Sequence, residues 1–133
     1  MKIIIDTNVL IDFSRKIKKK NEKLFWPQLV AYAKKEGHQL IVPSICLFEF
    51  FAGKEMDAPG NIGKADNLLS DMIILDINEE ISRKAAQLFR KYEFEIGVVD
   101  YLLAATALVL DGSLVTLNKK HFQNIKGLKF LEL

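Results

Sequence analysis

Short apolar runs alternate along the chain with longer segments in which apolar residues recur every three or four positions. The short runs lie at residues 2–5, 40–42, 72–75 and 114–116, and Ile, Leu and Val dominate them. Continuous runs of this length are typical of strands that are buried on both faces of a sheet. A weaker run at 128–131 is a candidate fifth strand. The pattern therefore predicts four or five buried strands.

The intervening segments have the apolar period of helices with one buried side. Ser44 and Asn78 stand where N-caps are expected, and the stretch 54–64, rich in Gly and Pro, is expected to be the loosest region. In the longest helix, the residues expected to face the core are Ile81, Ala85, Leu88 and Phe89. The pattern predicts helices over residues 7–17, 22–35, 45–52, 65–70, 79–92 and 101–110.

Strands that alternate with helices in this way predict an α/β domain with a mainly parallel central sheet. A chain of 133 residues fits one domain, here residues 1–133, and its apolar fraction of 50% is enough for a full core. In parallel sheets, ligands bind beyond the carboxyl ends of the strands. We therefore expect the functional residues to follow the strands directly.

The composition points to a cytoplasmic protein. Cys46 is the only cysteine, so no internal disulfide can form, and its apolar surroundings predict a core position. The run Ile3–Ile5 is too short for a signal-peptide core, and no apolar stretch reaches the ~18 residues that a membrane span needs. We expect no interaction with membranes.

Three acidic residues stand in apolar surroundings where solubility does not require them. Asp6 ends the first strand run in IIIDTNVLID, Glu49 lies inside ICLFEFFAG, and Asp100 precedes the most apolar helix in GVVDYLLAATAL. Asp6 and Asp100 could each be only a helix cap. Glu49 is harder to explain in that way, because apolar residues flank it on both sides and no cation is near it in sequence.

Acids that converge in an apolar site repel one another, and each is costly to bury without a partner. A divalent cation would remove that cost, and a set of oxygen ligands favours Mg²⁺ or Mn²⁺ over Zn²⁺. Such a centre can hydrolyse phosphodiesters by activating a water molecule. The small polar residues expected to fix the carboxylates by hydrogen bonds are Thr7, Asn8, Ser44 and Thr116.

Four segments that carry these residues resemble, in order, those of the PIN-domain family and, within it, the VapC-type toxins. Residues 3–12 resemble the opening strand and helix with the first acid, and residues 41–53 resemble the segment with the family's Ser and Glu. Residues 98–110 resemble the helix of the third acid, and residues 114–130 resemble the closing strands with a TxNxxxF turn. The resemblance spans nearly the whole chain.

The resemblance implies a three-layer α/β/α PIN-like domain that acts as a Mg²⁺- or Mn²⁺-dependent endoribonuclease on structured RNA. It also implies a cognate antitoxin that inhibits the enzyme, and a homodimer. Asp6, Glu49 and Asp100 match the three acids of the family, which implies that they are the catalytic residues and metal ligands.

The chain departs from the family pattern at a fourth acidic position. Many relatives have an Asp in the TxNxxxF turn, either where this chain has Asn118 or where it has His121. The absence of an acid argues against a second, fully occupied metal site. Asn118 could still bind a metal-bound water or the scissile phosphate. His121 either covers Phe122 at a turn, or it contacts phosphate or assists the leaving group.

Basic residues gather in two places, although the net charge of +2 is too small to identify a nucleic-acid binder. Such blocks serve either as solvated faces or as tracks for RNA phosphates. The candidate RNA-binding residues are Arg15, Lys16, Lys18, Lys19 and Lys20, with Lys119 and Lys120 near the end of the chain.

Three alternatives remain open at this point. A receiver-like phosphorylation switch would use Asp76 and Lys119, but it leaves Glu49 without a role. A PIN domain could also bind RNA or a partner without cutting. An active PIN nuclease could serve in RNA processing without any antitoxin.

Overall fold

The computed structural model describes residues 1–17, 25–93 and 96–131, and its centre is a five-stranded sheet. The strands lie in the order β3-β2-β1-β4-β5, and every neighbouring pair is parallel. This confirms the predicted parallel sheet and the candidate fifth strand. The strands are β1 (Lys2–Ile5), β2 (Gln39–Pro43), β3 (Ile73–Leu75), β4 (Ser113–Val115) and β5 (Lys129–Phe130).

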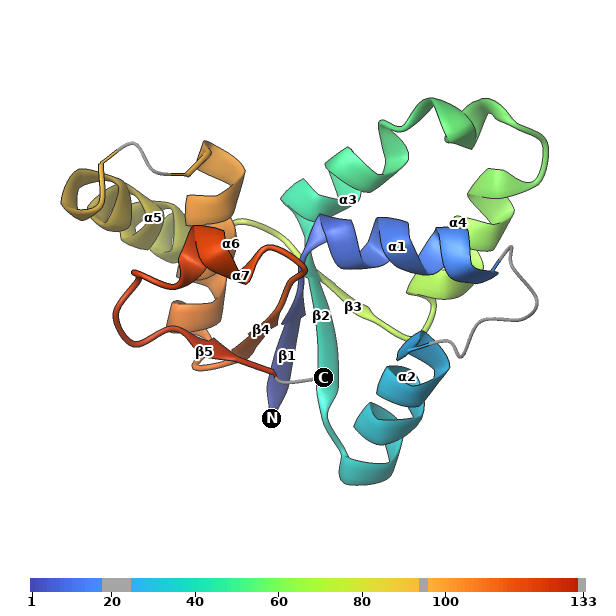
Figure 1. Cartoon of the computed structure of the whole chain (residues 1–133), viewed down its shortest axis with the longest axis horizontal. Helices are drawn as coiled ribbons and strands as arrows, with labels where there is room; N and C mark the ends of the chain where they lie inside the picture. Colours follow the sequence, from blue (N-terminus) through green and yellow to red (C-terminus); the bar gives the residue numbers. More distant parts are fainter. Residues whose placement is uncertain (18–24, 94–95, 132–133) are drawn as a thin grey trace.

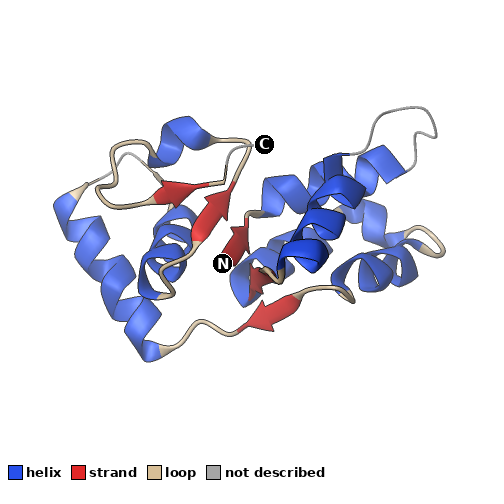
Figure 2. Ribbon diagram, turned by 90° about the horizontal axis from the view of Figure 1, so that it is seen from below, coloured by secondary structure: helices blue, strands red, loops and turns tan. Residues whose placement is uncertain are grey.

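Helices cover both faces of the sheet, as expected for three layers. In Figures 1 and 2, α1 to α4 lie on one side of the sheet, and α5 and α6 lie on the other. The helices are α1 (Thr7–Ile17), α2 (Phe25–Glu36), α3 (Ser44–Phe51), α4 (Asn61–Leu69), α5 (Glu79–Lys91), α6 (Val98–Val109) and α7 (Lys119–Phe122), with the 3-10 helix η1 at Lys54–Asp57.

The central strand β1 explains why the core runs through both layers. Ile3, Ile4 and Ile5 are fully buried, because helices pack on both faces and strands pair on both edges. Ile4 pairs with Ile41 of β2 on one side and with Leu114 of β4 on the other. The continuous apolar run in the sequence reflects burial of both faces.

Helix α5 confirms its predicted cap and corrects one core position. The side chain of Asn78 accepts a hydrogen bond of 2.9 Å from the backbone N–H of Ile81. Phe89 was expected to face the core, but 43% of it is exposed. Its ring packs edge-on against Tyr101 of α6, with the ring centroids 5.5 Å apart, because it lies at the margin of the buried stripe.

Two helix starts differ from the sequence predictions, at α3 and α4. The predicted start of the second helix at Glu22 lies outside the described residues. The segment expected to be loosest holds η1 and the start of α4, where Gly60 turns with a φ of 83° and the Asn61 side chain donates to the Glu55 carbonyl. Pro43, not Ser44, occupies the N-cap of α3, because its extended backbone already directs the chain into the helix.

The start of α6 also lies earlier than predicted. Gly97 is its N-cap, and Asp100 lies in the first turn of the helix instead of before it. The prediction was wrong because it began the helix at the fully buried run and left out Val98, which is 69% exposed.

The parallel register brings the carboxyl ends of three strands together. Ile5 of β1 pairs with Val115 of β4, so the residues that follow them, Asp6 and Thr116, are neighbours. The backbone N–H of Asp6 continues the ladder by donating to the carbonyl of Val115.

None of the helices in the part of the chain that the structure describes has the length and apolar character of a membrane span.

Candidate active site

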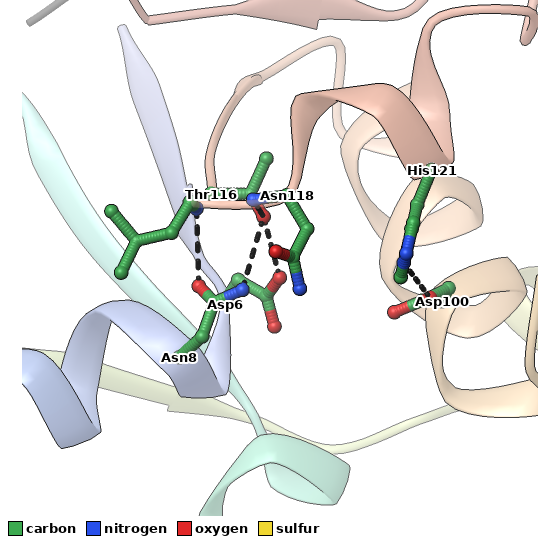
Figure 3. Close-up of polar contacts among 7 residues, drawn as sticks. Asp6, Asn8, Asp100, Thr116, Asn118 and His121 are labelled. Carbon is green, nitrogen blue, oxygen red and sulfur yellow. Dashed lines mark hydrogen bonds and ion pairs between the residues drawn. The ribbon is translucent and has the colours of Figure 1, made fainter.

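Asp6 is the buried centre of a polar network at the carboxyl end of β1. Only 5% of the residue is exposed, and the Thr116 hydroxyl donates a hydrogen bond of 2.7 Å to Oδ2 of Asp6. Thr116 Oγ1 in turn accepts from the Asn118 backbone N–H at 3.0 Å and from the Asn8 side-chain amide at 3.5 Å. Figure 3 shows this group around the Asp6 carboxylate. The contacts hold Asp6 in one orientation.

Burial raises the pKa of Asp6, and the negative charges of Asp100 and Glu49 raise it further. The hydrogen bonds from Thr116 and from the backbone of Thr7 act in the opposite direction. The fold therefore brings the three acids close enough for their charges to interact. A positive charge among them would stabilise the ionised form of Asp6.

Glu49 enters the site from α3 and contacts the start of α1. The Thr7 hydroxyl donates a hydrogen bond of 2.7 Å to Oε1 of Glu49, across 42 residues of sequence. Thr7 is itself buried, at 6% exposure, so its position is fixed by packing. Thr7 and Thr116 therefore hold one carboxylate each, which is the arrangement predicted for small polar neighbours of a metal centre.

Cys46 lies one turn before Glu49 and is fully buried, as predicted. Burial raises its pKa to about 12, with smaller contributions from the charges of Asp6 and Glu49. The thiol therefore stays protonated at neutral pH and is a core residue, not a nucleophile.

Asp100 contacts His121 of α7. His121 Nδ1 lies 3.2 Å from Oδ2 of Asp100, and 52% of the His121 side chain and 23% of the Asp100 side chain are exposed. Sequence reasoning missed this pair, because the contact depends on how α7 packs on α6. In Figure 3 the pair lies opposite the group around Asp6.

The other predicted residues lie in several environments. Among the hydrogen bonds of the described residues, none joins the Ser44 hydroxyl to a carboxylate. Asn118 is exposed at the N-terminal end of α7, and its side chain lies beside the Asp6 group in Figure 3. Arg15 is exposed on α1. Lys18, Lys19 and Lys20 lie outside the described residues, as does the side chain of Lys16.

Lys119 and Lys120 are exposed on α7, directly before His121. The Lys119 ammonium lies over the ring of Phe130, 5.6 Å from its centroid. These two lysines place positive charge on the helix that carries His121.

The positions of the side chains were also compared with what a metal-binding site requires. In the part of the chain that the structure describes, no three Asp, Glu, His or Cys side chains are close enough to hold one metal ion. Each carboxylate has a hydrogen-bonding neighbour instead, at Thr7, Thr116 or His121. The chemistry of the donors still fits a hard divalent cation, because all three acids offer carboxylate oxygens and the charges of Asp100 and Glu49 already raise the pKa of Asp6.

The class of protein is defined by a three-layer α/β/α domain in which Asp6 follows the central strand and is acted on by the charges of Glu49 of α3 and Asp100 of α6. The chain belongs to the PIN-domain family, whose model matches residues 3–128. This sets aside the receiver-like alternative.

Within the family, the chain is similar to VapC proteins. It is 31% identical to Ribonuclease VapC10 of Mycobacterium tuberculosis over 130 residues, which cover 96% of this chain and 90% of the relative. It is 29% identical to Ribonuclease VapC19 of the same organism, with 90% of each chain covered. Its fold matches a chain of the VapBC2 structure from Rickettsia felis, bound to a promoter DNA fragment, with a TM-score of 0.82, 25% identity and coverage of 100% and 99%.

Proposed function

We propose that this protein is a metal-dependent endoribonuclease and the toxin of a VapBC-type toxin–antitoxin pair. One observation carries the chemistry: Asp6 is buried, and the charges of Asp100 and Glu49 raise its pKa. The similarity to two proteins named as VapC ribonucleases supports RNA as the substrate. A protein that only bound RNA would gain nothing from three acids in its site, because phosphates are negative.

Asp6, Glu49 and Asp100 are the residues that would hold Mg²⁺ or Mn²⁺. When bound, the ion would polarise a phosphoryl oxygen and lower the pKa of a water molecule. The hydroxyls of Thr116 and Thr7 each donate a hydrogen bond to one carboxylate, which limits the rotamers that Asp6 and Glu49 adopt before the substrate binds. A carboxylate of the site accepts the proton of the attacking water.

The proposed partners are a cognate antitoxin and a second copy of the chain. VapBC structures from Rickettsia felis and nontypeable Haemophilus influenzae, each 25% identical to this chain, support the antitoxin. Large exposed apolar side chains support a dimer: Phe48 and Val98 are 69% exposed, and Leu117 is 61% exposed. In the sequence these residues are next to or near Glu49, Asp100 and Thr116, so a second copy that covered them would lie close to the acids.

The proposal is tested by incubating the purified protein with total RNA in Mg²⁺, in Mn²⁺ and in EDTA, and by mapping new RNA ends. Discrete new ends with either metal, and none in EDTA, are expected. RNA binding without new ends in either metal would leave a non-cleaving PIN domain. Growth arrest on expression, relieved by the neighbouring reading frame, would separate a toxin from an RNA-processing nuclease.

Replacing Lys119 and Lys120 together by Gln is expected to weaken RNA binding without changing kcat. If each lysine neutralises one phosphate of single-stranded RNA, the slope of log affinity against log salt falls by about 1.4. The metal centre is unchanged, so uniform binding is lost and KM rises. Lys34 and Lys35 are the matched control, because they lie in the last turn of α2, which leads to the amino end of β2, whereas the site lies at the carboxyl ends of the strands. Parallel salt plots for wild type and the α7 variant would contradict the assignment.

A further inference from the structure

The His121–Asp100 pair has the spacing of two ligands of one metal ion. Neighbouring ligands in an octahedral site, each ~2.1 Å from the ion, lie about 3 Å apart. His121 Nδ1 and Asp100 Oδ2 are 3.2 Å apart, which is also a hydrogen-bond distance, so an ion bound by both atoms would take the place of the proton between them. We propose that these two atoms ligate the same divalent ion, so that His121 biases the site toward transition metals such as Mn²⁺ and away from Mg²⁺. This inference rests on the metal dependence proposed above.

Both ligands come from elements that packing holds in place. On α7, Phe122 is fully buried directly after His121, and the His121 backbone N–H donates to the Asn118 carbonyl at 3.0 Å. On α6, Leu103 and Ala104 are fully buried within one turn of Asp100. Side chains on such anchored elements can keep a ligating geometry.

The surroundings of the pair also suit a metal ion. Asp100 acts on Asp6 through its charge, so the pair lies within the field of the three acids. Its partial exposure leaves room for water molecules and a phosphate oxygen to complete the coordination, as at sites where the ion contacts substrate. One imidazole beside three carboxylates leaves the net charge of the site negative, as a site for a cation requires.

The identity of the ligand atom determines the expected preference. Mg²⁺ binds oxygen almost exclusively in proteins, whereas imidazole nitrogen is a good ligand for first-row transition metals. Asn118, the other side chain at this end of α7, offers only a neutral amide oxygen. The non-acidic residue at position 121 is therefore a selectivity determinant, not merely a lost acid.

Electron spin echo envelope modulation of bound Mn²⁺ tests the proposal directly, because it detects a ¹⁴N nucleus coordinated to the ion. The chain has two histidines, and the other one, His38, directly precedes the amino end of β2, whereas the site lies at the carboxyl ends of the strands. Imidazole modulation is expected in wild type and in His38→Asn, and it is expected to vanish in His121→Asn. Circular dichroism verifies that both variants fold.

A second measurement is the ratio of the Mg²⁺ and Mn²⁺ dissociation constants, obtained by displacing Mn²⁺ with Mg²⁺. His121→Asp should shift this ratio about tenfold toward Mg²⁺. The ratio is the readout because the added charge strengthens binding of both ions. Bound Mn²⁺ without imidazole modulation in wild type would overturn this inference and leave the proposed metal site standing. Failure to bind Mn²⁺ at all would overturn both.

Discussion

Replacing Asp100 by Asn is expected to lower the rate of RNA cleavage by at least about 100-fold while the fold stays intact. Loss of a residue that only supports a metal ligand already costs about 10–100-fold, and Asp100 is proposed as a ligand itself. Asn has nearly the same size, and its side-chain oxygen can still face His121. The substitution lies in the first turn of α6, where it removes no cap, because Gly97 occupies that position.

Asp111→Asn is the matched control for this experiment. Asp111 follows the other end of α6, its side chain is 90% exposed, and it pairs with Lys129 at 2.9 Å. Its φ of 52° is in the left-handed region, which Asn tolerates better than most residues. The same chemical change there should leave cleavage unchanged. If Asp100→Asn cleaves RNA at the wild-type rate in Mg²⁺, Asp100 does not belong to the active site.

The opening of the chain shows how much local sequence can predict. The run of isoleucines followed by Asp-Thr predicted β1 and α1 at the bounds that the structure has, because burial of both faces and helical periodicity are local signals. The alternation of strands and helices predicted the parallel sheet. It placed Asp6 at the carboxyl end of a strand, where ligands bind in such sheets.

Other features of the site depend on contacts between distant segments. No local pattern joins Thr7 to Glu49 or His121 to Asp100, because these contacts arise only when α1 packs near α3 and α7 packs on α6. Family resemblance identified the residues of the site but not which of them contact one another. The sequence therefore selected the three acids as candidates, and the structure added what each of them contacts.

The burial of Asp6 beside two other acids has a measurable consequence for the stability of the metal-free protein. Its pKa is raised in the folded state, so the folded protein binds this proton more tightly than the unfolded chain does. The free energy of unfolding should therefore fall as the pH rises from the ordinary value of 3.8 through the raised pKa, and it should stay lower at neutral pH. A bound divalent cation should remove this loss.

Asp6→Asn should accordingly stabilise the metal-free protein at neutral pH, by about 1–2 kcal/mol, as replacements at strained functional sites commonly do. The Asn side-chain oxygen can still accept the hydrogen bond from Thr116, so the main change is the loss of a buried charge. Mg²⁺ should then raise the melting temperature of wild type more than that of the variant, because the variant has lost a ligand. Thermal melts across pH, with and without Mg²⁺, measure both effects, and Asp66→Asn on the exposed side of α4 serves as the control. Equal melting temperatures without metal, together with equal shifts in Mg²⁺, would show that Asp6 is neither strained by its neighbours nor a ligand.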